Sequence, residues 1–216
     1  MSRFLLIALL VLTTASAAAE IVDRPEQVRP LLPGQVVPAF ELKSVSGKAV
    51  QVDPATFEKP VVLTFYRGGW CPYCNLHLSE LRHAEETLRQ LGFEVWFVSP
   101  DRPELLAEGQ DAAEGYELYS DADAVAARLF GVAFRLDDDT HANYQGYGVD
   151  ITERAGTGHR ALPVASTFLI GTDGTVQFSF ANPDYTVRLH PNVLLAVAEA
   201  YREKSHERLR RQRRQD

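Results

Sequence analysis

The pattern of apolar and polar residues predicts a sheet with helices packed on it. Residues 61–66 and 93–99 are nearly unbroken apolar runs, rich in β-branched and aromatic side chains, and such runs are typical of strands buried on both faces. Between them, apolar residues recur at spacings of three and four, as in a helix with one buried face: Leu78, Leu81, Ala84, Leu88 and Leu91. This strand, helix and strand predict a parallel crossover unit.

Shorter segments on either side extend the α/β pattern. Residues 39–43 and 49–52 alternate around a Ser-Gly turn and predict an N-terminal hairpin. Residues 166–170 and 176–180 flank an Asp-Gly turn and predict a second hairpin. The remaining expected elements are helices at 103–107, at 123–130 (ending at Gly131) and at 191–204, and a strand at 116–120. The apolar stripe of the last helix is expected to be Val193, Leu194, Val197 and Ala198.

Residues 137–158 break this regularity. They are polar and rich in Gly and Asp, so they are expected to be irregular. Asp137, Asp138, Asp139 and His141 suggest a cation site, but their spacing is not that of an EF-hand. An acidic loop of this kind is expected to be solvated.

The two ends of the chain differ from the middle. Residues 1–19 combine Arg3, an apolar run and three final alanines, which is the pattern of a cleaved signal peptide. The apolar run is short for a bilayer, so we expect no stable membrane anchor and predict a periplasmic or secreted protein, in a compartment where disulfides persist. Residues 20–33 hold several prolines and predict an extended N-terminal arm. Residues 205–216 form a basic tail, either a docking element or a solvated helix end.

Length and charge narrow the classes of function. Residues 34–204 suit a single domain with a substantial core. The formal net charge is −7, which argues against nucleic acid as a partner. The sequence does not predict an oligomeric state.

The candidate chemistry lies where the first buried run meets the first helix. Cys71 and Cys74 form a CxxC motif after Gly68 and Gly69, with Pro72 at the expected first helical position. A cysteine that caps a helix faces free N–H groups and tends to ionise at a lowered pKa. We therefore expect Cys71 to be the more accessible and more acidic thiol, with Cys74 turned toward the core. A CxxC at a strand–turn–helix junction indicates a redox dithiol.

A structural disulfide, a zinc site and a c-type haem account for the motif less well. A structural disulfide that closes so small a loop would constrain the unfolded chain little. A zinc site needs about four ligands, and the chain has only two cysteines. A c-type haem requires His directly after the second cysteine, where Asn75 stands. No metal and no cofactor beyond the dithiol itself is expected.

The order of elements and the CxxC resemble the thioredoxin superfamily, and more closely the peroxiredoxin-like branch of the alkyl hydroperoxide reductase/thiol-specific antioxidant family. Residues 38–42, 65–74 and 166–170 are similar to that family's opening strand, redox motif and late core strand. The resemblance implies a thioredoxin-like mixed sheet flanked by helices. It places Cys74 at the peroxidatic position.

The chain departs from the family pattern at three positions. Arg67 stands where peroxiredoxins carry Pro, Cys71 where they carry Thr or Ser, and Ala165 where they carry a catalytic Arg. A thioredoxin would have a cis-Pro near Ala165, and Pro163 is two residues away. On these grounds we expect weak peroxidase activity, with Arg67 or Arg160 as the first candidates to replace the missing arginine.

Three functions follow, in order of preference. The first is an exported thiol–disulfide oxidoreductase that acts on protein or small thiols and disulfides. The second is a thiol peroxidase that reduces hydroperoxides through Cys74, with Cys71 resolving. The third is a redox-inert binding domain.

Several neighbours of the cysteines are candidate site residues. Arg67 is expected to supply a fixed positive charge near the sulfurs, the alternative being a surface ion pair. Trp70 and Tyr73 are expected to bind substrate, with core packing as the alternative for Trp70. His77 is either a proton shuttle or a bystander. The resemblance adds two more candidates, Tyr185 and Arg188.

Overall fold

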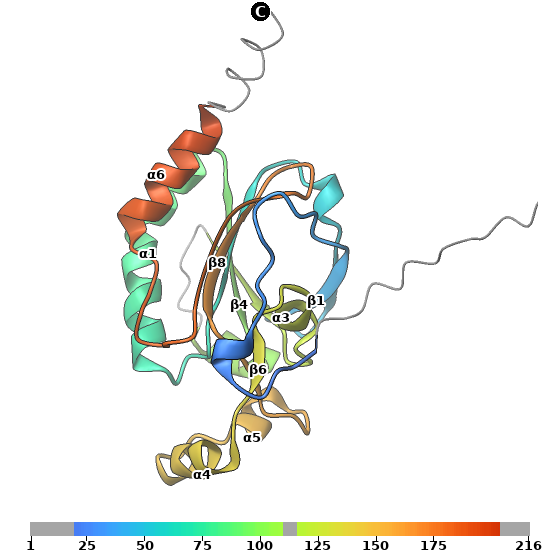
Figure 1. Cartoon of the computed structure of the whole chain (residues 1–216), viewed down its shortest axis with the longest axis vertical. Helices are drawn as coiled ribbons and strands as arrows, with labels where there is room; N and C mark the ends of the chain where they lie inside the picture. The colour runs from blue at the N-terminus through green and yellow to red at the C-terminus, as the bar shows by residue number, and fades with distance from the viewer. Residues whose placement is uncertain (1–19, 110–115, 204–216) are drawn as a thin grey trace, which may run out of the picture.

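The structure is a computed structural model that describes residues 20–109 and 116–203 (Figure 1). The predicted signal peptide and basic tail lie outside these residues, so export and the role of the tail stay predictions. Within the described ranges, no helix is long and apolar enough to cross a membrane.

Seven strands form one mixed sheet in the order β2-β1-β5-β4-β3-β8-β9. Their bounds are β1 (Phe40–Ser44), β2 (Ala49–Val52), β3 (Val61–Phe65), β4 (Glu94–Ser99), β5 (Glu117–Ser120), β8 (Ala165–Ile170) and β9 (Val176–Asn182). Strand β3 is buried along its whole length and pairs parallel with β4 and antiparallel with β8. The crossover unit and both hairpins predicted from the sequence are confirmed.

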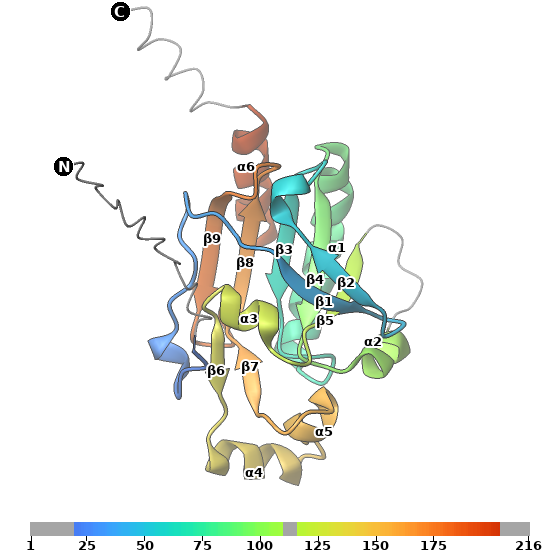
Figure 2. The same cartoon turned by 90° about the vertical axis from the view of Figure 1, so that its right-hand side faces the viewer.

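Helices cover both faces of this sheet (Figures 1 and 2). The helices are α1 (Pro72–Gln90), α2 (Pro103–Gly109), α3 (Val125–Leu129), α4 (Asp138–Gly146), α5 (Ile151–Ala155) and α6 (Pro191–Arg202). Helices α1 and α6 lie side by side on one face, and their apolar residues, including Leu81 and Leu194, form one core. Helix α3 covers the other face, where Phe130 packs edge-on against Phe65 and Phe168. The start of α1 thus follows directly on β3, a central strand of the sheet.

Two expectations about helices are wrong. Residues 137–158 are not irregular, because Asp137 and Asp150 cap α4 and α5 by accepting bonds from backbone N–H groups. In the same segment Asp137, Asp138 and Asp139 are exposed, as expected of a solvated acidic cluster, whereas His141 is buried, 3.4 Å from the Asp150 carboxylate. Val193 does not belong to the buried stripe of α6: it is exposed, and Leu194 and Ala198 face the core.

The structure also contains a small second sheet that the sequence pattern did not predict. Strand β6 (Ala133–Arg135) pairs antiparallel with β7 (Ala161–Pro163). The predicted arm at residues 20–33 runs along β6, where Val22 bridges to Phe134, and it contains one 3-10 turn at Pro25–Gln27. Helices α4 and α5 project from the end of this small sheet, near the start of α1 (Figure 2).

Candidate active site at the redox turn

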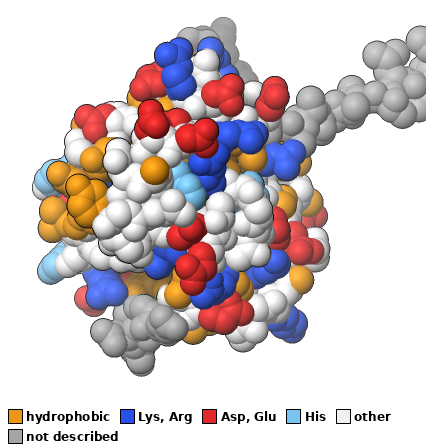
Figure 3. Space-filling view, turned by 90° about the horizontal axis from the view of Figure 1, so that it is seen from below, with side chains coloured by type: hydrophobic (Ala, Val, Ile, Leu, Met, Phe, Trp, Pro, Cys, Tyr) orange, Lys and Arg blue, Asp and Glu red, His pale blue; other side chains and the backbone are white. Residues whose placement is uncertain are grey.

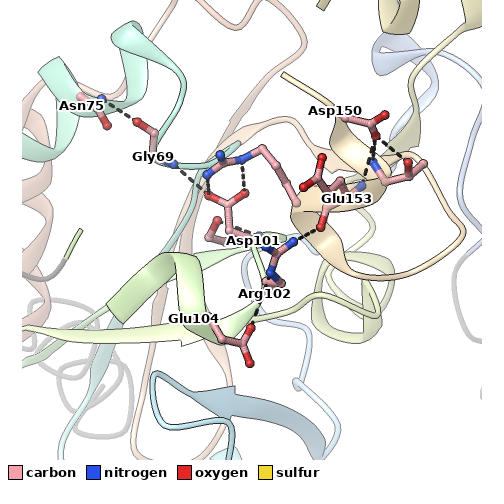
Figure 4. Close-up of polar contacts among 10 residues, drawn as sticks. Gly69, Asn75, Asp101, Arg102, Glu104, Asp150 and Glu153 are labelled. Atoms are coloured by element: carbon pink, nitrogen blue, oxygen red, sulfur yellow. Dashed lines mark hydrogen bonds and ion pairs between the residues drawn. The ribbon is translucent and has the colours of Figure 1, made fainter. Parts of the chain in front are cut away.

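The turn between β3 and α1 is shaped by glycine and held by Asp101 (Figure 4). Gly68 has a φ of +133°, and a Cβ there would lie 2.7 Å from the Asp101 carboxylate, so only glycine fits. The next residue, Gly69, donates its N–H to Asp101 at 3.0 Å, and its carbonyl accepts from the side chain of Asn75 at 2.8 Å. The turn is thus tied both to the end of β4 and to α1.

Asp101 is itself held by Arg154 of α5. The two side chains form a bidentate ion pair with distances of 2.8 and 2.9 Å, and Asp101 is buried. Neither residue was predicted to belong to the site. Asp101 follows a buried parallel strand, a position at which ligands often bind in α/β folds, and that signal was available. Arg154 lies in the segment expected to be irregular, where no local pattern points to the turn.

Both cysteines are free thiols, and both are buried. Cys71 is the N-cap of α1, as predicted. Cys71 is nevertheless not open to solvent: it is 2% exposed and Cys74 1%, because both pack in one apolar cluster with Tyr66 and Trp70. The Cys71 side chain makes no capping hydrogen bond of ordinary geometry.

The two thiols titrate as a pair. A hydrogen bond from Cys74, its backbone amide and the charges of Arg67 and Arg188 lower the pKa of Cys71 to about 6, although burial opposes this. The same hydrogen bond between the two thiols, together with burial, raises the pKa of Cys74. Coupled groups of this kind lose their protons in two steps that belong to the pair. The lowered pKa of Cys71 and the raised pKa of Cys74 therefore favour a singly ionised pair, with the negative charge on Cys71 and the remaining proton on Cys74.

Arg188 lies directly on the sulfur of Cys74. Its Nη2 donates to Cys74 Sγ at 3.4 Å, and it comes from the segment between β9 and α6. Cys74, Ala165 and Arg188 line one internal void too narrow for a water molecule. Ala165 of β8 has a small side chain, and the void beside it is also lined by Arg188, which comes from the segment between β9 and α6. Arg160, a first candidate for this task, instead pairs with Asp138 at 2.5 Å.

Arg67 is a buried cation in an aromatic cage. Its guanidinium carbon lies 5.1, 5.4 and 4.7 Å from the ring centroids of Trp70, Tyr144 and Tyr185, and Nη2 donates to the Tyr144 hydroxyl at 2.6 Å. No carboxylate of the described residues forms an ion pair with it. The surface ion pair considered above is therefore wrong. Arg67 is a fixed charge that lowers the pKa of Cys71.

The two predicted substrate-binding residues differ in exposure. Trp70 is half-buried and packs on Tyr144 at 5.3 Å. Tyr73 is exposed and packs edge-on against Tyr185 at 5.6 Å. Exposed apolar side chains gather at one edge of the molecule when it is seen from below (Figure 3). Substrate binding by Trp70 and Tyr73 stays a prediction.

The structure also shows the surroundings of His77 and the conformation of the peptide bond before Pro163, two further candidates from the sequence. His77 is buried, and its Nε2 lies 3.0 Å from the carbonyl oxygen of Leu189. The Leu162–Pro163 peptide bond is trans, since the described residues contain no cis bond. In the part of the chain that the structure describes, no group of three or more His, Cys, Asp or Glu side chains is arranged to hold a metal ion.

Comparisons with known proteins agree with this geometry. The AhpC/TSA family matches residues 33–179. Peroxiredoxin Bcp of Escherichia coli is 25% identical over 169 residues, which is 78% of this chain and 96% of that protein. A putative peroxiredoxin bcp of Haemophilus influenzae is 34% identical over 106 residues, 49% of this chain and 68% of that protein.

Solved structures show the same fold. Peroxidoxin BcpB of Mycobacterium tuberculosis aligns with a TM-score of 0.58 and 23% identity, over 78% of this chain and 96% of the other. Peroxiredoxin Q of Xanthomonas campestris aligns with a TM-score of 0.55 and 20% identity, over 76% and 91%. The thioredoxin-like peroxiredoxin fold is thereby confirmed. The chain belongs to the AhpC/TSA family and is a peroxiredoxin-family thiol-based antioxidant enzyme.

Proposed function

We propose that the enzyme is a thiol peroxidase in which Cys74 attacks a hydroperoxide and Cys71 resolves the product. The observation that carries the proposal is the 3.4 Å contact between Arg188 Nη2 and Cys74 Sγ. A guanidinium at this place favours the thiolate form of Cys74 and lies where charge develops on the departing peroxide oxygen. The sequence favoured disulfide exchange because two groups were missing from their expected positions, this arginine and the hydroxyl for which Cys71 stands. Arg188 supplies a guanidinium in place of the first.

The burial of the sulfurs also favours a small substrate. Cys71 and Cys74 expose 2% and 1% of their surface, so a protein disulfide could reach neither sulfur without movement of the turn. A hydroperoxide needs much less space. Members of this family named above are peroxiredoxins, which supports hydroperoxides as substrates and external thiols as reductants.

The proposed reaction has four steps. The Cys74 thiol first passes its proton to the neighbouring Cys71 thiolate. The Cys74 thiolate so formed attacks the distal peroxide oxygen, an S–O bond forms, and the O–O bond breaks with its electron pair on the leaving oxygen. That oxygen takes the proton of Cys71 and leaves as alcohol or water, while Cys74 becomes a sulfenic acid. The Cys71 thiolate then attacks the Cys74 sulfur, an S–S bond forms, and hydroxide leaves and is protonated to water. Two external thiols reduce the disulfide and are themselves oxidised to a disulfide.

A second function rests on one separate observation. The lowered pKa of Cys71, about 6, is typical of attacking thiols in disulfide exchange. Thiol–disulfide oxidoreduction is therefore the second candidate, and it requires the redox turn to open toward the partner.

Rapid mixing separates the two candidates. Reduced wild-type protein, Cys71→Ser and Cys74→Ser are mixed with hydrogen peroxide, and oxidation is followed by tryptophan fluorescence and mass spectrometry. We expect a disulfide in the wild type, a trapped sulfenic acid in Cys71→Ser, and no reaction in Cys74→Ser. Peroxide consumption by Cys74→Ser at the wild-type rate would overturn the assignment. Slow peroxide reaction with rapid reduction of a model protein disulfide would favour the second candidate.

A further inference from the structure

We propose that His77 is a positioning residue that holds Arg188 on the sulfur of Cys74. The proposal rests on the thiol peroxidase function proposed above and adds the residue that sets its geometry. It replaces both sequence-based interpretations of His77, the proton shuttle and the bystander.

His77 and Cys74 lie three positions apart on the same face of α1. The Nε2 atom of His77 is 3.0 Å from the carbonyl oxygen of Leu189, and both residues are buried. A carbonyl oxygen only accepts, so Nε2 carries the proton. The hydrogen bond therefore connects α1 to the Leu189–His190 peptide group, one residue after Arg188.

The side chain of Arg188 has little else to hold it. Among the described residues its guanidinium forms no ion pair, its hydrogen bond goes to Cys74, and its Nε is buried without a partner. With so few side-chain contacts, the position of the Arg188 guanidinium depends mainly on where the backbone of residue 188 lies. That backbone is held upstream by Asp184, which accepts from Thr186, and downstream by His190, which caps α6. His77 supplies the anchor between these two points.

One rigid helix thus carries both the sulfur and the anchor of the guanidinium. Loss of the His77 donor would leave the Leu189 carbonyl buried without a partner, which is unfavourable. The segment would then turn this carbonyl toward water and move Arg188 away from Cys74. The expected consequence is slower peroxide reduction and a higher pKa of the thiol pair.

The test compares matched variants of α1. His77→Leu removes the donor and keeps an apolar volume, whereas His77→Gln keeps an N–H near the position of Nε2. His83→Leu is the control, because His83 is exposed on the same helix. We expect His77→Leu to lower the rate constant with hydrogen peroxide by at least ~10-fold, a part of the ~10²–10³ that a complete donor loss costs. His77→Gln should restore most of the rate, and His83→Leu should leave it unchanged.

A double-mutant cycle tests whether the effect passes through Arg188. In an Arg188→Met background, His77→Leu should cause little further loss, because residues that act through one another are not additive. An equal loss in both backgrounds would overturn the proposal, and so would a wild-type rate in His77→Leu. If His77→Leu does not fold, His77→Asn, whose amide is too short to reach Leu189, takes its place.

A second readout does not depend on peroxide. The pH at which iodoacetamide alkylates the reduced pair at half its maximal rate should rise in His77→Leu, as in Arg188→Met. An unchanged value would overturn the role of His77. If the wild type itself does not react with peroxide, the proposed function fails, while the alkylation profile still decides the role of His77.

Discussion

The guanidinium of Arg188 lies 3.4 Å from the sulfur of Cys74, although the two residues are 114 positions apart in the chain. In this enzyme the positive charge at the sulfur is thus supplied from the segment before α6. The strand position where the family resemblance places an arginine holds Ala165.

Replacing Arg188 by methionine should therefore slow peroxide reduction. The loss of one donor aimed at the departing oxygen typically costs ~10²–10³ in rate. Arg160→Met is the matched control, since Arg160 pairs with Asp138 away from the sulfurs, and it should keep the wild-type rate. Stopped-flow fluorescence measures both variants. Equal rates for the two would mean that Arg188 does not assist the reaction.

Arg67 should tune the acidity of the pair. Arg67→Met removes a buried charge that lowers the pKa of Cys71, so the thiolate should form at a pH higher by on the order of one unit. Tyr144→Phe keeps the ring of the cage and removes only the hydroxyl that accepts from Arg67, so its shift should be smaller. The ultraviolet absorbance of the thiolate, titrated against pH, is the measurement. No shift in Arg67→Met would contradict this role.

The reduced enzyme should be more stable at neutral than at acidic pH through its thiol pair. The folded pKa of Cys71, about 6, lies below its unfolded value, so its contribution is fully present above the unfolded pKa. It is lost as the pH falls through about 6. Burial raises the pKa of Asp121 to about 7, so the contribution of Asp121 to stability falls as the pH rises. The effect of Cys71 must therefore be measured as a difference between two proteins that both contain Asp121.

Urea unfolding of the reduced wild type and of Cys71→Ser should therefore be compared between about pH 5 and 8. The contribution of Asp121 cancels in the difference between the two proteins. The stability advantage of the wild type should grow as the pH rises. A difference that does not depend on pH would contradict the lowered pKa.

Asp101 should matter for both stability and rate. Asp101→Asn leaves the partly buried Arg154 without its counterion, which we expect to cost ~3 kcal/mol in the free energy of unfolding. It also weakens the acceptor that holds Gly69, so the peroxide rate should fall. Asp123→Asn removes an exposed ion pair with Lys43 and should change neither quantity appreciably. Urea unfolding and stopped-flow mixing measure both effects.

The local sequence pattern alone determined the strand, turn and helix on which the two cysteines lie. The run at residues 61–66, the glycines after it and the spacing of Leu81 and Leu88 were sufficient to predict the strand, the turn and the helix that carry Cys71 and Cys74. These features depend on neighbours in the chain, through strand burial, turn conformation and helix periodicity. For the same reason Cys71 could be predicted as the helix cap.

Only the tertiary structure decided what surrounds the sulfurs. The burial of Cys71, the contact of Arg188 with Cys74 and the support of the turn by Arg154 all join segments far apart in the chain. Such contacts depend on how α1 packs against α6 and where α5 lies, and no periodicity within a segment encodes them. The preference between disulfide exchange and peroxide reduction depends on these contacts, because charge and access at the sulfur, rather than the CxxC spacing, favour one reaction over the other.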